Sequence, residues 1–281
     1  MKLLTDVHTH SAFSHDGIDE LSTMLAAALE KGAAFYGVSE HFDYDLCAES
    51  VQSHNLKMID EEGYFHAARH LQEDYAGCMN VLVGAEFGYS EDEKVWGRYA
   101  ATYEKHRPDF VVNSVHCKDG WDYHSQRAFY TQTGGEPVLR PKEETLAEYF
   151  ALVEKSLDAP YPYDIVGHLG YAARYAPYDE KEIKYAEFSE QIDRVLLKIV
   201  EKGKILEVNT STYGLKQRTL PSAEILARYF ELGGRNVSFA SDAHSTDRIL
   251  KDREYVVQTL KELGFTYITV PCRGEYVRVD L

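Results

Sequence analysis

The chain has little cysteine and no long apolar run. Its four cysteines, Cys47, Cys78, Cys117 and Cys272, are scattered and form no C-x-x-C pair, which predicts reduced thiols in a cytoplasmic protein. No run of about 18 apolar residues occurs, so we expect no membrane-spanning helix. The N-terminus lacks a basic region followed by an apolar stretch, so we expect no signal peptide.

Positive charge is also scarce. Lysine and arginine together number 30, against 46 aspartates and glutamates, and the formal net charge is −16. Nucleic-acid binding uses a basic surface, so this balance argues against a nucleic-acid partner. The overall field also repels anions, so an anionic substrate would need positive charge placed locally, by metal ions or by a few arginines.

The chain does have a regular alternation of strand and helix signals, which predicts βα units and a parallel sheet. The expected strands cover residues 3–8, 35–40, 81–87, 110–116, 165–168, 205–209 and 237–242, with a last strand pair near 267–270 and 276–279. The clearest helices cover 18–31, 141–157, 187–202 and 223–232. Seven such units fit one closed or nearly closed α/β barrel, a single domain over residues 1–281. The stretches 43–60 and 118–140 are predicted to be loops over a site.

Histidines and carboxylates follow the predicted strands at the points where they end. His8 and His10 close the first strand, His15 lies in the loop after it, and the later ends carry His41, Glu86, His116, His168, Asp242 and His244. In α/β barrels the C-terminal strand ends meet at the face where the chemistry sits. Histidine and carboxylate are ligands for divalent zinc, iron and manganese. Six of the seven strand ends carry such residues. This pattern predicts a metal-dependent hydrolase.

The spacing of these residues adds to the argument. His8-x-His10 and Asp242-x-His244 each suit one metal, because residues two apart on an extended strand point the same way. By contrast, the helical pair His66 and His70 lies in a charged stretch without a third ligand, which favours a solvated face.

The roles of two further side chains stay open at this point. Glu40 is either a partner that orients His41 or a polar strand end. Asp16, followed by Gly17, either marks a turn or orients His15.

Together the motifs have a family likeness. His8-x-His10, Glu40-His41, His116 and Asp242-x-His244 resemble the four signature motifs of the PHP (polymerase and histidinol phosphatase) superfamily. The segments 6–17, 84–89, 113–116 and 167–171 resemble, more narrowly, the PHP-type histidinol-phosphate phosphatases of histidine biosynthesis. The resemblance covers essentially the whole chain. It implies a distorted (β/α)7 barrel with the metal site at the C-terminal strand ends, and hydrolysis of L-histidinol phosphate to L-histidinol and phosphate.

The resemblance also implies a ligand set for three divalent ions of zinc, iron or manganese. Carried over by position, His8, His10, Glu86 and Asp242 hold one ion, Glu86 bridges to a second held by His116 and His168, and His15, His41 and His244 hold a third.

Phosphate binding and proton transfer need further groups. Arg174, six residues past His168, is the first candidate to bind the phosphoryl group, and Lys216 and Arg218 are weaker candidates. The leaving alcohol takes its proton either from a ligand carboxylate such as Asp242 or from a metal-bound water, and both stay open.

Three functions remain at this stage. The first is histidinol-phosphate phosphatase. The second is another PHP phosphoesterase, acting on a small monoester, a phosphotyrosyl protein or a nucleotide. The third is a non-catalytic metal-binding barrel, which the intact ligand set disfavours. We expect a small-molecule phosphate monoester as the partner, without nucleic acid or membrane; no segment indicates an oligomeric state.

Overall fold

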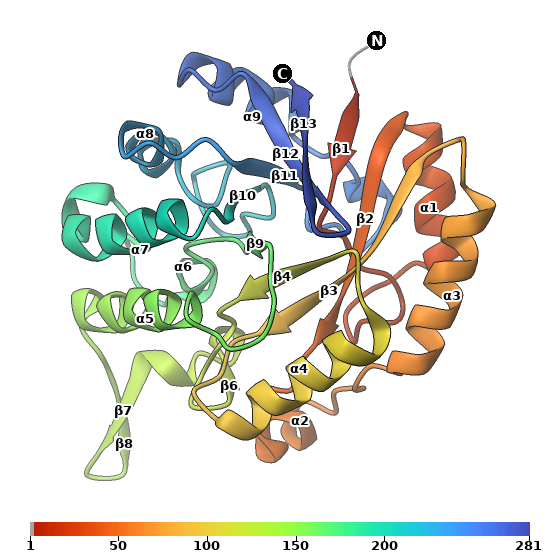
Figure 1. Ribbon diagram of the computed structural model, residues 1–281. Coiled ribbons are helices and arrows are strands. Elements are labelled where there is room, and N and C mark those ends of the chain that lie inside the picture. Colours follow the sequence, from red (N-terminus) through yellow and green to blue (C-terminus); the bar gives the residue numbers. More distant parts are fainter. Residues whose placement is uncertain (1–2) are drawn as a thin grey trace.

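The computed structural model describes residues 3–281 and is built around a seven-stranded parallel sheet (Figure 1). Its strands follow one another in the order of the chain: β1 (Leu4–Asp6), β2 (Ala33–Phe42), β3 (Asn80–Gly88), β4 (Phe110–Ser114), β9 (Ile165–Val166), β10 (Ile205–Asn209) and β11 (Val237–Ala240). The first and last strands approach each other just past the end of β1. There Thr9 bridges Ala243, and the N–H of Val7 donates to the carbonyl of Phe239, so the sheet closes on itself. The protein is therefore a nearly closed (β/α)7 barrel, as predicted.

Helices surround the barrel on its outside (Figure 1). They are α1 (Leu21–Glu30), α2 (Ala48–Ser53), α3 (Glu61–Asp74), α4 (Glu93–His106), α5 (Lys142–Ser156), α6 (Ala172–Tyr175), α7 (Ser189–Glu201), α8 (Ala223–Glu231) and α9 (Arg253–Glu262). The four predicted helices are confirmed to within three residues at each end. Pro141 sits one residue before α5, and Glu143 and Glu144 occupy its first turn as expected.

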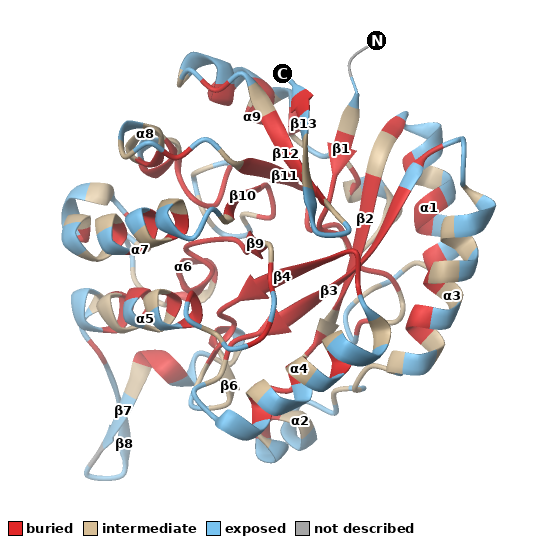
Figure 2. Ribbon diagram, in the orientation of Figure 1, coloured by how far each residue is buried: buried red, intermediate tan, exposed pale blue. Residues whose placement is uncertain are grey.

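The strands are buried and the outer faces of the helices are exposed (Figure 2). Parallel strands covered on both sides carry apolar runs, as β3 does from Val81 to Ala85 and β4 does from Phe110 to Val112. Inside the barrel, Phe110 packs where a Cβ on Gly84 would lie 2.4 Å from its ring, so glycine at position 84 makes room for it. None of the helices among residues 3–281 is long and apolar enough to cross a membrane.

The predicted last strand pair forms a separate hairpin, β12 (Tyr267–Cys272) and β13 (Glu275–Asp280). Its Val270 and Val279 pack into the barrel interior with Phe110 and its apolar neighbours. The N–H of Arg273 donates to the carbonyl of Asp109, which immediately precedes β4. The hairpin therefore covers the end of the barrel where the strands begin, which leaves the opposite end for the site.

The two predicted loops contain short elements. The first carries α2, and the second carries two hairpins, β5 (Cys117–Lys118) with β6 (Trp121–Asp122) and β7 (Tyr130–Thr133) with β8 (Glu136–Leu139). A single-turn 3-10 helix, η1 (Tyr123–Ser125), follows β6.

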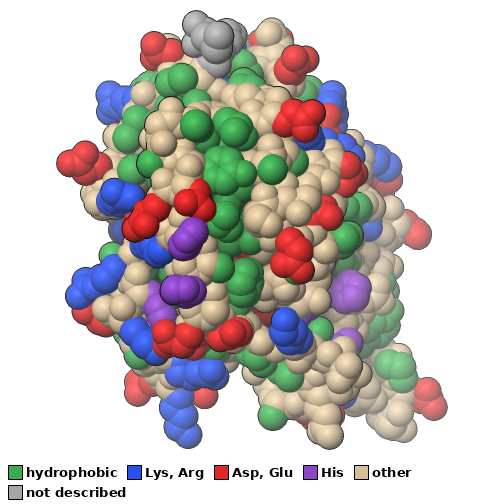
Figure 3. All heavy atoms as spheres, turned by 90° about the vertical axis from the view of Figure 1, so that its right-hand side faces the viewer, with side chains coloured by type: hydrophobic (Ala, Val, Ile, Leu, Met, Phe, Trp, Pro, Cys, Tyr) green, Lys and Arg blue, Asp and Glu red, His purple; other side chains and the backbone are tan. Residues whose placement is uncertain are grey.

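The surface on the side of α1 and α3 shows acidic and basic side chains interspersed (Figure 3). His66 and His70 are exposed on α3, and the Nδ1 of His70 lies 3.2 Å from the Oδ2 of Asp74. Their prediction as part of a solvated face is confirmed.

Candidate metal centre

The first and last strands bring the two ends of the chain together at the site. Past the end of β1, the N–H of Asp242 donates to the carbonyl of His8 at 2.9 Å, and the N–H of His10 donates to the carbonyl of Ala243 at 2.8 Å. Asp242 adopts a φ of 52°, a left-handed conformation that aspartate tolerates better than most residues. The backbone therefore sets His8 and His10 beside Asp242, from opposite ends of the sequence.

The other strand ends complete a buried cluster. Its potential ligand atoms form four groups, each within 4.8 Å: His8, His10 and Asp242; His8, Glu86 and His168; His41, Glu86 and His116; and His10, His41 and His244. These groups include eight of the nine residues predicted from the sequence. The ring of His10 stacks against those of both His41 and His244, with centroid separations of 4.1 and 4.3 Å.

Glu86 lies at the centre of this cluster, and its two oxygens face different histidines. Oε1 is 3.1 Å from Nε2 of His116 and 3.0 Å from Nε2 of His168. Oε2 is 2.8 Å from Nδ1 of His41 and 3.3 Å from Nε2 of His8. The carboxylate therefore connects two groups of histidines, as a bridging ligand does.

Several contacts in the cluster fit divalent ions better than hydrogen bonds. The Nε2 atoms of His8 and His10 lie 3.0 Å apart, and those of His116 and His168 lie 3.2 Å apart. Glu86 Oε2 and His41 Nδ1 are buried and lie 2.8 Å apart without the geometry of a hydrogen bond, and neither has another hydrogen-bond partner among the described residues. Buried polar atoms without partners are costly unless something else satisfies them. Imidazole and carboxylate donors converging in this way suit zinc, iron or manganese.

The electrostatics keep the two carboxylates ionised. Burial alone would raise the pKa of Glu86, but the positive charges of His8, His116 and His41 hold it well below its usual range. Burial opposes the ionisation of Asp242 in the same way, while its hydrogen bond with His10 and the charges of His8 and Arg174 keep its pKa well below normal. Positive charge at this point, from protons or from metal ions, therefore stabilises both anions.

His15 stands at the edge of the cluster. It belongs to none of the four groups, its ring centroid is 5.5 Å from that of His41, and its Nδ1 lies 3.0 Å from Oδ2 of Asp43. The neighbouring Asp16 does not hold His15. Its carboxylate lies 3.2 Å from Nε2 of His244 and 3.7 Å from Nε2 of His41.

Glu40 is a buried partner of the loop after β1 and not merely a polar strand end. It accepts from the backbone N–H groups of Ser11 and Ser14 and from both of their hydroxyls, at 2.5 to 3.1 Å. Ser14 Oγ lies 3.2 Å from Nδ1 of His10 and accepts from the N–H of His41 at 3.0 Å. Glu40 thus helps fix two ligands through Ser14.

Sequence reasoning missed Glu207. This residue lies inside β10, with no accessible surface, and its Oε1 is 2.6 Å from Nδ1 of His8. Its Oε2 accepts from the N–H of His168, also at 2.6 Å. A carboxylate within an otherwise apolar strand was the available signal, because a buried charge needs a partner.

The predicted cations differ in where they lie. Arg174, on α6, is 6% exposed, and its Nη2 donates to Oδ1 of Asn209 at 3.1 Å and to Oδ2 of Asp242 at 3.2 Å. Lys216 and Arg218 are exposed side chains paired with Glu180 and Asp252. The structure does not bring these two to the cluster, because their loop turns toward the surface after β10.

Two cavities open onto the cluster from different sides. The arginine cavity, about 280 Å³, is lined by Arg174, Arg248 and Ser211 together with ligands that include Asp242 and His168. The aspartate cavity, about 440 Å³, is lined by Asp16, Asp43 and Asp122 and by apolar side chains such as Leu46 and Leu56. The two cavities share Asp16, His41, His116, Tyr171 and Tyr175. A molecule bound at the cluster can therefore extend into both cavities.

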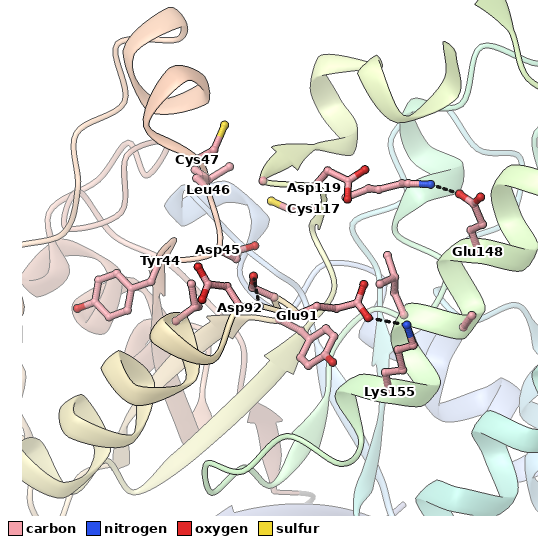
Figure 4. Close-up of a pocket in the computed structure, with 17 residues that line it drawn as sticks. Tyr44, Asp45, Leu46, Cys47, Glu91, Asp92, Cys117, Asp119, Glu148 and Lys155 are labelled. Carbon is pink, nitrogen blue, oxygen red and sulfur yellow. Dashed lines mark hydrogen bonds and ion pairs between the residues drawn. The ribbon is translucent and has the colours of Figure 1, made fainter. Parts of the chain in front are cut away.

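A larger cavity of about 690 Å³ lies next to the aspartate cavity and contains none of the predicted ligands (Figure 4). Acidic residues of its wall outnumber the two lysines. Lys118 pairs with Glu148, and Lys155 pairs with Glu91, as Figure 4 shows for the second pair.

Residues 6–211 match the PHP domain, and the chain belongs to this family. The matched region contains seven of the nine predicted ligands; Asp242 and His244 follow it, just past the end of β11. The chain is 29% identical over 249 residues to a Clostridium acetobutylicum protein named "Probable histidinol-phosphatase", covering 88% of this chain and 89% of that one. It is 26% identical over 260 residues to the histidinol-phosphatase of Lactococcus lactis subsp. lactis, covering 92% and 91%.

A solved structure agrees in fold. The crystal structure of histidinol phosphate phosphatase from Lactococcus lactis, complexed with zinc, L-histidinol and phosphate, superposes with a TM-score of 0.80 at 24% identity, covering 98% of each chain. The barrel is therefore of the PHP type, as the resemblance implied.

Proposed function

We propose that this protein is a metal-dependent phosphatase that hydrolyses L-histidinol phosphate to L-histidinol and phosphate. The observation that carries the proposal is the buried cluster around Glu86, with Arg174 beside it at the mouth of the barrel. The two relatives bearing histidinol-phosphatase names, each aligned over most of both chains, support this substrate over other monoesters.

The ligands would hold three divalent ions of zinc, iron or manganese. His8, His10, Glu86 and Asp242 would hold one, with Glu86 bridging to a second at His116 and His168, and His15, His41 and His244 would hold the third. The group of His8, His10 and Asp242 supports the first set, and the contacts of Glu86 Oε1 with His116 and His168 support the second. The edge position of His15 makes the third the most open to solvent. When bound, such ions activate a water molecule and neutralise charge on the phosphoryl oxygens.

The chain's own residues contribute binding and proton transfer. Arg174 is fixed by Asn209 and Asp242 and presents its guanidinium to the arginine cavity, where it binds a phosphoryl oxygen. Asp242 is ionised at neutral pH, so its carboxylate accepts the proton released by the attacking water and returns it to the leaving alcohol. The P–O bond to the alcohol breaks as the bond to the water oxygen forms.

A substrate panel tests the proposal. Phosphate release is measured with metal-loaded protein on L-histidinol phosphate, an aryl phosphate without an amino group, a phosphotyrosyl peptide and a nucleoside monophosphate. We expect the highest kcat/KM for L-histidinol phosphate. A higher value for another monoester would assign the protein to a different PHP phosphoesterase activity, and no hydrolysis of any of them would favour a non-catalytic barrel.

A further inference from the structure

The arginines that line the two cavities all lie on one side of the cluster, whereas aspartates line both cavities. The arginine cavity brings Arg174 and Arg248 to one side of the ligands. The aspartate cavity, on the other side, is lined by three aspartates, and no lysine or arginine of residues 3–281 lines it. The site therefore suits a molecule that is anionic at one end and cationic at the other.

The three aspartates of this cavity have different partners. Asp16 lies 3.2 Å from Nε2 of His244, and Asp43 lies 3.0 Å from Nδ1 of His15, so predicted ligands hold both. Asp122 accepts instead from the hydroxyl of Tyr171, 3.2 Å from each oxygen, and from the N–H of His124 at 2.6 Å. These donors are neutral, so the negative charge of Asp122 is left for a ligand.

Asp122 lies close to the predicted metal ligands, with Tyr171 between them. The ring of Tyr171 packs against those of His116 and His168, with centroid separations of 4.9 and 5.0 Å. Because the hydroxyl of the same tyrosine donates to Asp122, one side chain separates this carboxylate from the cluster. The Nε2 of Gln126, just past η1, donates to the carbonyl of Tyr175 at 3.2 Å and joins the segment after Asp122 to α6. Asp122 is therefore held at a fixed place in the cavity wall.

Burial also changes the pKa of the Asp122 carboxylate. It raises the pKa of Asp122, although the charge of His116 and the hydrogen bond from His124 oppose that rise. A carboxylate shielded from water gains more from a cation placed against it than an exposed one does.

We infer that Asp122 binds the ammonium group of the substrate's amino alcohol and makes the enzyme selective for cationic phosphate monoesters. This inference rests on the proposed function. With the phosphate at the metals and Arg174, the alcohol portion extends into the aspartate cavity, where Leu46 and Leu56 contact its less polar part. Asp122 then acts on specificity and not on the bond-breaking step.

The test compares two monoesters that differ only in the amino group, L-histidinol phosphate and 3-(imidazol-4-yl)propyl phosphate. Asp122→Asn keeps the size and an acceptor oxygen for Tyr171 and His124 but removes the charge. We expect kcat/KM on L-histidinol phosphate to fall by about 10- to 100-fold, mainly through KM, as for a lost charge-assisted hydrogen bond. The value on the deamino monoester should be unchanged.

A matched control is Asp119→Asn. Asp119 is exposed in the turn between β5 and β6 and lines the neighbouring cavity, so this variant should resemble the wild type on both monoesters. Equal losses on both monoesters in Asp122→Asn, or no loss on either, would overturn the inference. The wild type offers an independent check, because equal kcat/KM on the two monoesters would also overturn it. A metal-loaded wild type that hydrolyses neither would reject the proposed function itself.

Discussion

The Nδ1 of His8 and the Oε1 of Glu207 lie 2.6 Å apart, and both side chains are completely buried. Burial would raise the pKa of Glu207, but the charge and hydrogen bond of His8 bring it below its usual value. An ionised carboxylate on the outer nitrogen fixes the ring and makes the inner nitrogen a better metal donor. Because the other oxygen binds the backbone of His168, one residue of β10 orients two predicted ligands.

Glu207→Gln should therefore weaken metal binding without removing any ligand. We expect an apparent affinity about 10- to 100-fold lower, the usual effect of losing such a partner. Metal content after dialysis against a weak chelator measures it. Glu201→Gln, an exposed change at the end of α7, is the control and should keep wild-type content. Wild-type metal retention in Glu207→Gln would contradict the orienting role.

Glu86→Gln tests the bridge. An amide offers one neutral oxygen in place of two charged ones, so it cannot serve both the His116 and the His41 sides. We expect bound metal and turnover to fall together, as measured by elemental analysis and phosphate release. A crystal structure of the loaded protein with Glu86 turned away from every ion would refute the bridging role.

Arg174→Ala should separate phosphate binding from metal binding. We expect unchanged metal content and a kcat/KM about 10²- to 10³-fold lower, the typical effect of removing one such donor. Arg174→Lys should recover part of the loss, because lysine keeps the charge but not the planar fork. Arg194→Ala, an exposed change on α7, is the control. Near-wild-type kcat/KM in the loaded Arg174→Ala protein would shift the role to Arg248, which lines the same cavity.

The ligands were predictable because their positions follow from the fold. Once strands and helices alternate, the ends of the strands must meet, and residues such as His41 and Glu86 can be read off in order. The strands themselves are shorter than predicted at several ends. β4 stops at Ser114 and β9 at Val166, because pairing ends where the chain turns to present His116 and His168.

Other features depend on contacts between distant parts of the chain. Glu207 was passed over because it lies inside a strand and not at its end, and its partner His8 is 199 residues away. The pattern near Tyr267 predicts a strand pair, but nothing local specifies that it docks under the barrel. The sequence ranks Arg174 above Arg218 by its distance from His168, but the partners of the two arginines, Asp242 and Asp252, depend on contacts between distant segments.

Metal dependence of L-histidinol phosphate hydrolysis tests the central claim most directly. Phosphate release is measured for the protein as purified, after thorough removal of metal, and after reloading with zinc, manganese, iron or cobalt. The cluster around Glu86 predicts that turnover is abolished on metal removal and returns with at least one of these ions. Undiminished turnover in demetallated protein, or no turnover in the fully loaded protein, would contradict the account.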